Sequence, residues 1–339
     1  MLDLMNSTWE LGLASISLLE LEEADLSVFG RDPFNTTHTQ TRNLSPNSTV
    51  VQIANAVMSS RPPSIQPLAV DGSAGDPASL GVAVMLASRA RRNDPEYAQA
   101  AAAQLHFLAR GGTTSAEWGN QHACRSSPAV ERLCVHGSTF IAFHGAMNEN
   151  VTELQEAKRQ AGFYRDALRD SETKLWRHIV LGMGLAAAGM VRIAQTMAKS
   201  RFASQLAQDT KEMVEWTREL VGACWQYQTP SGALFNHPLN EDFIDSSWTA
   251  LLASATYRLA VLDGNKTHIA RADSAADYVA AHIDGDGELH QVVNGTNWNF
   301  PQAEKSAQAQ AFVLLMQAAR RDYGTWESGG GQPILGTLV

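Results

Sequence analysis

Four histidines recur through the chain at nearly even intervals. His122, His178, His237 and His290 are 56, 59 and 53 residues apart. Each follows a polar turn and one or two apolar residues, and two segments of helical periodicity separate successive copies. A period of roughly 55 residues that holds a helix pair and a turn is typical of stacked helical hairpins. If the hairpins close into a ring, the turns gather at one mouth, where we expect the functional site.

The apolar periodicity predicts a chain built almost entirely of helices. Asp76-Pro77 and Asp94-Pro95 are helix starts, since proline at the first helical position needs no N–H donor. Short extended pieces are expected after three turns, at 174–180, 232–237 and 287–293. No alternation of strands and helices indicates a parallel sheet. The predicted helices are 7–24, 49–59, 77–92, 94–110, 130–146, 150–169, 183–199, 204–226, 243–262, 266–283 and 303–323.

Length and charge exclude several function classes. The chain has 339 residues, 44% of them hydrophobic, which is enough for one large core. Its net charge of −9 argues against a nucleic-acid partner, because such proteins favour basic surfaces. No apolar run approaches the roughly 18 residues that a membrane span requires. No signal peptide is visible either, because Glu20, Glu22 and Glu23 interrupt the first apolar run.

Seven Asn-x-Ser/Thr sequons nevertheless favour the secretory pathway, with the signal peptide already removed. The alternative is a Ser/Thr-rich cytosolic chain whose spacing is accidental. The three cysteines fit both cases: Cys124 and Cys134 could form a disulfide that leaves Cys224 free, or all three could be thiols. The sequons begin at Asn6, Asn35, Asn43, Asn47, Asn150, Asn265 and Asn294.

Several stretches between residues 70 and 323 together resemble one enzyme family. They include Leu175-Trp-Arg-His178, Ala186-Ala-Ala-Gly-Met190 and the run from Ser247 to Ala260. The chain resembles the fungal branch of the six-hairpin glycosidases, the unsaturated glucuronyl and rhamnogalacturonyl hydrolases of glycoside hydrolase family 105. The resemblance implies an all-α (α/α)6 toroid with a pocket at one mouth. We therefore expect one domain over 1–339, with an N-terminal helix and glycosylatable loop (1–70), a repeat core (71–323) and a loose tail (324–339).

The chain departs from the family pattern at three places. The family's general acid/base is an aspartate, and Arg132 stands at the aligned position. A guanidinium, with a pKa above ~12, cannot exchange that proton. The family's loop before the helix at Ala186 is shortened, and Gln308 replaces a carboxylate of another motif. These losses suggest a scaffold that kept its fold and changed its chemistry.

The losses favour a cofactor-independent cyclisation or isomerisation of a small, largely apolar metabolite of fungal secondary metabolism. In this hypothesis Arg132 stabilises developing negative charge, and His136 or His178 exchanges the proton. A water-poor cavity would fold the substrate into a reactive conformer. The residues expected to bind the substrate are Trp118, His122, Trp176, His237, Asp245, Trp248 and Gln308.

Two other functions remain open. The chain could hydrolyse an unsaturated uronic-acid saccharide with a displaced carboxylate, either Glu131 or Asp245, or it could bind carbohydrate without catalysis. A polar mouth with tryptophans would favour a saccharide, and a dry pocket would favour the apolar metabolite. No metal is expected, because no HxxxH or CxxC pair occurs and Asp284-Gly-Asp-Gly-Glu288 is better explained as a turn than as a calcium loop. Asp245 also precedes Ser-Ser-Trp248 as a helix N-cap.

Overall fold

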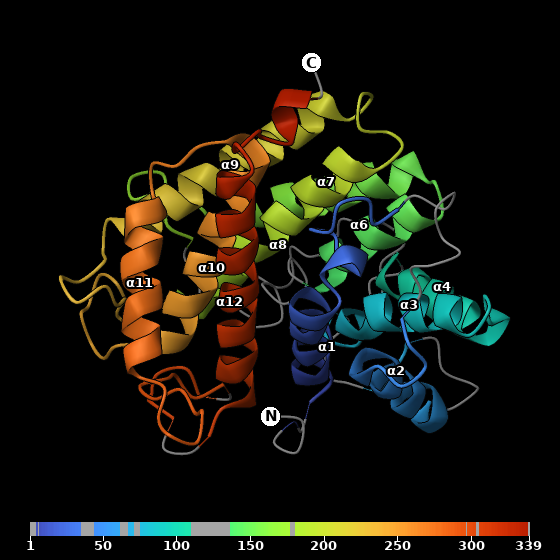
Figure 1. Ribbon diagram of the computed structural model, residues 1–339, viewed down its shortest axis with the longest axis horizontal. Coiled ribbons are helices and arrows are strands. Elements are labelled where there is room, and N and C mark those ends of the chain that lie inside the picture. Colours follow the sequence, from blue (N-terminus) through green and yellow to red (C-terminus); the bar gives the residue numbers. More distant parts are fainter. Residues whose placement is uncertain are drawn as a thin grey trace.

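The structure is a computed structural model, and it describes residues 5, 7–34, 44–61, 67–70, 75–109, 136–176, 180–295, 297–302 and 305–337. Within them, helices make nearly all the regular structure, and the extended segments meet only through isolated bridges. The fold is the predicted all-α toroid. Its first and last helices lie side by side and close the ring (Figure 1).

Six helices form the inner ring of the described chain, and each contacts the next around a closed circuit. All six run in the same sense, so their N-terminal ends gather at one end, which we call the mouth. In ring order they are α1 (Thr8–Glu22), α3 (Gly81–Ala90), α6 (Ser138–Met147), α8 (Val180–Lys199), α10 (Ser246–Asp263) and α12 (Ala307–Ser328).

Outer helices pack against the inner ones, and α2, α7 and α9 each contact two neighbouring inner helices. The outer α7 buries one stripe, Leu154, Ala157, Ala161, Tyr164 and Leu168, at the spacing of an amphipathic helix. By contrast, the inner α10 is buried on all sides. The outer helices are α2 (Thr49–Ser60), α4 (Pro95–Ala109), α7 (Val151–Leu168), α9 (Ala207–Trp225) and α11 (Ile269–Ala281), and the short 3₁₀ helices are Ala24–Leu26, Pro77–Leu80 and Leu335–Thr337.

Small residues set the close spacing of the inner ring. A Cβ added to Gly12 of α1 would lie 2.0 Å from Ser79 Oγ, and one added to Gly81 would lie 2.2 Å from the ring of Phe140. These distances are far inside van der Waals contact, so only glycine fits at either position. The prediction that small residues nest the helices agrees with this packing.

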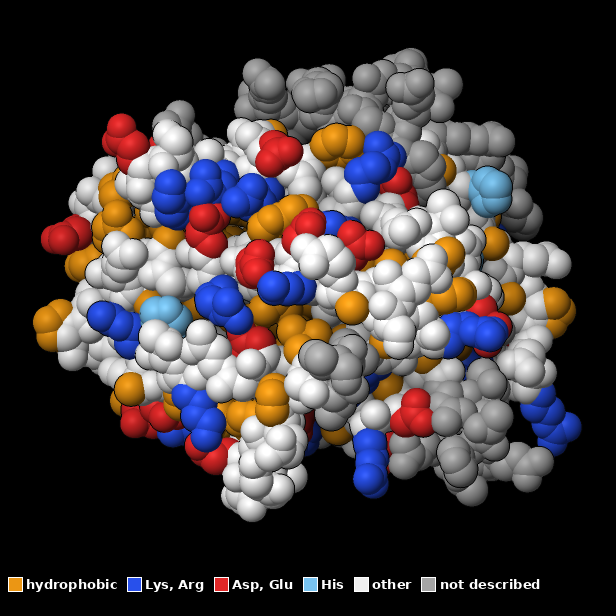
Figure 2. Space-filling view, turned by 90° about the horizontal axis from the view of Figure 1, so that it is seen from above, with side chains coloured by type: hydrophobic (Ala, Val, Ile, Leu, Met, Phe, Trp, Pro, Cys, Tyr) orange, Lys and Arg blue, Asp and Glu red, His pale blue; other side chains and the backbone are white. Residues whose placement is uncertain are grey.

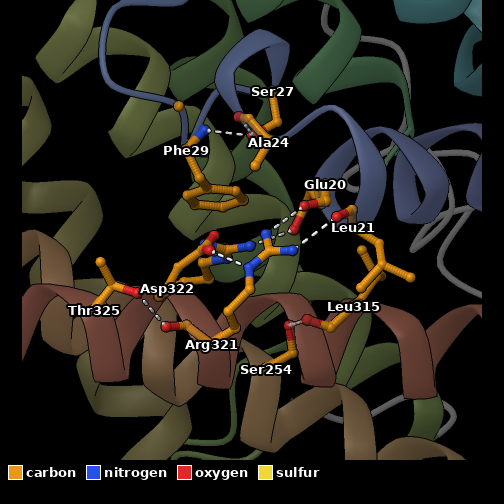
Figure 3. Close-up of polar contacts among 12 residues, drawn as sticks. Glu20, Leu21, Ala24, Ser27, Phe29, Ser254, Leu315, Arg321, Asp322 and Thr325 are labelled. Carbon is orange, nitrogen blue, oxygen red and sulfur yellow. Dashed lines mark hydrogen bonds and ion pairs between the residues drawn. The ribbon is translucent and has the colours of Figure 1, made fainter.

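A buried ionic cluster holds the C-terminal halves of the inner helices together. Glu20 of α1 is 2% exposed, and it pairs with Arg192 of α8 and with Arg258 of α10 at 2.9 Å. Arg258 also pairs with Asp322 of α12, and its guanidinium lies 4.0 Å above the Phe29 ring. Figure 3 shows Glu20, Asp322 and Phe29 converging from three separate segments. The ion pairs therefore link α1, α8, α10 and α12 at the end of the ring opposite the mouth.

The C-terminal segment differs from the loose tail predicted over 324–339. Helix α12 continues to Ser328, and the chain then folds back over the end of α10. Trp326 donates its indole N–H to Gln332 O at 2.7 Å, and Pro333 packs against Gly264. The glycine-rich composition suggested disorder, but apolar contacts made by Trp326, Pro333 and Ile334 hold the described part of this segment.

Positive and negative side chains are interleaved on the face shown in Figure 2. None of the helices in the described ranges is both long enough and apolar enough to cross a membrane.

Candidate functional site

Four of the predicted site residues, Trp118, His122, Arg132 and His178, lie outside the described residues, as do Glu131, Cys124 and Cys134. The third cysteine, Cys224, is a buried free thiol on α9, and burial raises its pKa far above the usual value. The described residues of the mouth come from the start of α6, the 169–176 loop and the segments that precede α10 and α12.

His136 stands at the very start of the α6 segment. Its side chain is 1% exposed, and its carbonyl accepts a hydrogen bond from Thr139 Oγ1 at 3.3 Å. The predicted acid/base histidine is thus enclosed within the ring rather than open to solvent.

Two predicted substrate-binding tryptophans lie beneath the mouth. Trp176 is 3% exposed and bridges to Arg169, while Trp248 is fully buried. The indole N–H of Trp248 donates to Phe235 O at 3.0 Å. Neither side chain leaves a face open for stacking on a ligand, so both support the loops above them.

Asp245 is the N-cap of α10, as its sequence context predicted. Its Oδ1 accepts hydrogen bonds from Ser247 N at 2.9 Å, Ser247 Oγ at 2.5 Å and Val293 N at 3.2 Å. The carboxylate is fully buried, and this burial raises its pKa to about 6, although the hydrogen bonds oppose the shift. Oδ2 has no hydrogen-bond partner among the described residues. Asp245 thereby joins the 291–302 loop to the start of α10.

Asn236 adds a second connection to the same loop. The Phe235–Ile244 bridge is antiparallel, which puts Asn236 and Asp245 on one face of the strand pair as diagonal neighbours. The Asn236 amide donates to Trp298 O at 2.8 Å. Asn236 Oδ1 is buried, and no described group donates to it. The mouth therefore has a polar floor under the 291–302 loop.

Gln308 lies in the first turn of α12, behind the N-cap Ser306, and is 3% exposed. A Cβ on Gly295 would come 3.1 Å from Gln308 Oε1 and 3.6 Å from the Trp9 ring. Gln308 thus packs closely beneath the 291–302 loop, and a side chain at Gly295 would require Gln308 to shift by a few tenths of an ångström.

An oriented histidine lies at the rim of this floor. His237 Nδ1 pairs with Asp242 Oδ2, and Asp242 Oδ1 accepts the backbone N–H of His237 at 2.9 Å. Both side chains are about 30% exposed, at 31% and 29%. Hydrogen bonding to His237 helps to hold the pKa of Asp242 below its usual value, against the opposing effect of burial. Nε2 has no partner among the described residues, so it is available to a ligand or to water.

Sequence reasoning found His237 and missed Asp242. The two residues are five apart, at opposite ends of a turn. This spacing matches neither the periodicity of a helix nor that of a strand. The usable signal was the pair of apolar segments at 232–237 and 243–244, which predicts that the turn between them closes on itself.

The described residues contain no group of three His, Cys, Asp or Glu side chains that could hold a metal ion. The Asp284–Glu288 segment is a turn, as predicted. Its Asp284 Oδ1 accepts the N–H groups of Asp286 and Glu288 at 2.9 and 3.0 Å. Asp284 Oδ2 pairs with His290 at 2.7 Å on the exposed surface.

Comparisons with known proteins give similarity at the level of structure. No protein-family model matches the sequence, and no curated protein does. A possible member of the GH105 family from Salmonella enterica superposes with a TM-score of 0.73 at 15% identity, over 93% of this chain and 83% of that one. A family 88 glycosyl hydrolase from Bacteroides vulgatus gives 0.64 at 12%, over 94% and 93%.

A sugar epimerase from a ruminal bacterium has the same fold, with a TM-score of 0.62 at 13% identity, over 91% of this chain and 87% of that one. The chain therefore has the six-hairpin glycosidase-like fold that the sequence motifs predicted. At these identities the comparisons establish the fold alone.

Proposed function

We propose that this protein is a saccharide-processing enzyme that hydrolyses an unsaturated uronic-acid saccharide at the mouth of the toroid. The observation that carries the proposal is the His237–Asp242 pair, a partly exposed imidazole held by a carboxylate at the rim of a polar floor. An imidazole fixed in this way presents one nitrogen in a defined tautomer, as an acid/base catalyst requires.

The reaction requires a group that first donates a proton to the substrate and then accepts one from water. His237 Nε2, when protonated, donates to the carbon–carbon double bond of the substrate, and the neutral imidazole then accepts a proton from the attacking water. Asp242 stabilises the charged imidazole on Nδ1 and keeps Nε2 directed outward. These transfers add water across the double bond; the hydrated ring then opens at its ring oxygen and the anomeric carbon releases the second sugar as an alcohol, so the steps balance without a cofactor. Under this proposal, a histidine replaces the displaced carboxylate, Glu131 or Asp245, that the sequence suggested.

The described mouth favours a saccharide over an apolar metabolite. The imidazole of His237 and the carboxylate of Asp242 are partly exposed there, beside the buried amide of Asn236 and the buried carboxylate of Asp245 that hold the 291–302 loop. The cyclisation predicted from the sequence rests on Arg132 and His178, which lie outside the described residues, and on His136, which is enclosed. Asp245, Trp176, Trp248 and Gln308 take positioning roles in the proposal, because each is at most 3% exposed.

We also propose a secretory location, in which Asn47 and Asn265 carry glycans. Both side chains are exposed, and Asn265 Oδ1 accepts the N–H of Thr267 at 2.9 Å, a turn that presents the sequon outward. Seven sequons in one chain support this compartment.

The test is hydrolysis of a disaccharide with an unsaturated uronic acid at its non-reducing end. The reaction is monitored by the loss of the ultraviolet absorbance of the double bond. We expect His237→Gln to lower kcat by at least a hundredfold, the usual contribution of a general acid/base. Asp242→Asn should lower kcat less and shift the pH profile.

The matched control is His290→Gln, which removes an exposed histidine from a similar His–Asp pair on the next turn. It should leave kcat unchanged. Equal losses in His237→Gln and His290→Gln would overturn the role of His237.

A further inference from the structure

A hollow lies among the outer helices, and none of its lining residues belongs to the 234–245 or 291–302 segments that form the mouth floor. It occupies about 380 Å³ between the C-terminal end of α9 and the N-terminal end of α11, with the 169–176 loop beside it. This volume falls in the lower range of small-molecule sites, roughly 300–1,000 Å³. We call it the α9–α11 groove. Its polar lining residues are Lys174, Arg218, Glu219, Gln226, His268 and Arg271.

The groove has more positive than negative charge. Lys174 and Arg271 make no ion pair with any described residue; Lys174 donates to Ser171 O, and Arg271 to Trp225 O at 2.8 Å. Backbone carbonyls orient these two cations without neutralising them. In a chain of net charge −9, two uncompensated cations beside one hollow indicate a site for a negative ligand.

The one carboxylate of the lining is already engaged. Arg169 binds Glu219 through two hydrogen bonds, from Nε at 2.6 Å and Nη2 at 2.7 Å, and Arg165 adds a third at 3.3 Å. This bidentate pairing leaves Glu219 little capacity to neutralise Lys174 or Arg271. The third cation, Arg218, pairs with Asp263 at 2.6 Å, and its Nε has no described partner.

Gly222 and His268 meet in the wall of the groove. Gly222 forms part of the wall, and a Cβ there would lie 3.3 Å from His268 Nε2. The glycine thus leaves room for the imidazole, which adds a polar ring to the lining.

We propose that the α9–α11 groove is an anion-binding site that takes a small molecule through a carboxylate, phosphate or sulfate group held by Lys174 and Arg271. The guanidinium offers paired N–H donors to two anion oxygens, and the ammonium supplies a point charge. The site is separate from the proposed hydrolysis at His237 and does not depend on it.

The experiment is calorimetric titration of the full chain with three probes at low salt: glucuronate, inorganic phosphate and glucose. We expect glucuronate or phosphate to bind and glucose not to bind. The double variant Lys174→Gln/Arg271→Gln should lower the affinity for the anion at least tenfold. Arg271→Lys, which keeps the charge, should retain part of the affinity, and 0.5 M salt should weaken binding to the wild type.

Two control variants separate this site from the rest of the molecule. Arg320→Gln removes an exposed arginine from α12, outside the groove, and should leave the affinity unchanged. His237→Gln should also leave it unchanged, so failure of the hydrolysis proposal would not be mistaken for failure here.

The outcomes decide the proposal. Loss of glucuronate binding in the double variant identifies an acidic saccharide as the ligand class, and loss of phosphate binding alone identifies a phosphorylated one. Anion binding that is equal in the wild type and the folded double variant would overturn the assignment, as would binding of glucose as tight as that of glucuronate.

Discussion

The Asp245 carboxylate accepts the backbone N–H of Val293 at 3.2 Å, across 48 residues of sequence. One buried oxygen thereby caps α10 and holds the loop that follows α11. Because the group is fully buried, its protonation is coupled to folding, and this coupling can be measured.

Asp245 should make the protein less stable as pH rises from about 4 to about 6. Its folded pKa, about 6, lies above the usual value of an aspartate, near 3.8, so the folded state binds the proton more tightly. Protonation of Asp245 therefore contributes up to about 3 kcal/mol to the free energy of unfolding. This contribution is fully present below the pKa of the unfolded state and is lost as pH rises through the folded pKa. Urea unfolding of the wild type and Asp245→Asn at several pH values measures it. The wild type should lose stability relative to the variant over this window; parallel curves would contradict the prediction.

Glu20→Gln should be strongly destabilising. The change leaves Arg192 and Arg258 without their shared buried carboxylate, and breaking such a pair costs about 3–5 kcal/mol. The free energy of unfolding in urea measures the loss. The matched control is Glu327→Gln, which breaks the exposed pair with Lys266 and should cost less than about 1 kcal/mol. Similar losses in both variants would show that burial of the cluster contributes nothing.

Gly12→Ala should destabilise the protein by about 1–3 kcal/mol, because the new Cβ would overlap Ser79 at the contact between α1 and the 77–80 turn. Gly324→Ala provides the comparison. That glycine is also helical, nothing lies within 4 Å of its added Cβ, and alanine should gain about 0.5–1 kcal/mol there. Thermal unfolding of the two variants should therefore shift in opposite directions. A gain in both would mean that α1 moves aside without cost.

Glycosylation should differ among the sequons. The side-chain nitrogen of Asn150 donates to Glu153 Oε1 at 2.8 Å, and its oxygen caps α7. A glycan on that nitrogen would disturb the cap, whereas Asn47 and Asn265 are exposed. Peptide mapping after expression in a eukaryotic host should find glycans on Asn47 and Asn265 and none on Asn150. An unmodified chain would contradict the secretory proposal, and a fully occupied Asn150 would contradict this account of its cap.

Local signals predicted the helices well, because their causes are local. The helices predicted over 243–262 and 303–323 begin at Ser246 and Ala307, behind the caps Asp245 and Ser306, and Gly264 ends α10 in the left-handed conformation, with φ of 76°. All three residues lie at the ends of the helices that they start or stop, so each helix boundary and the residue that causes it are close together in the sequence. The ring was predictable too, because the turns recur in the sequence at the period of one helical hairpin.

Contacts between distant residues could not be predicted in the same way. Glu20 and Arg258 are 238 residues apart, and nothing near either one indicates the other. Trp248 illustrates a second difficulty. Its place beside a mouth turn suggested a ligand contact, but the direction of its side chain is set by the packing of α10, and that direction leads inward. The partner of His237 was missed because a tight turn, rather than a periodic pattern, brings Asp242 to it.

The central claim is that the mouth adds a proton to an unsaturated uronic acid. The most direct measurement is incubation of the wild type with an unsaturated uronic-acid disaccharide in D₂O, with the saturated disaccharide alongside. The account predicts that the unsaturated substrate is consumed, that its product has one deuterium bonded to the carbon that was protonated, and that the saturated disaccharide is untouched. Persistence of the unsaturated disaccharide with the folded protein, or its cleavage without deuterium on carbon, would contradict it.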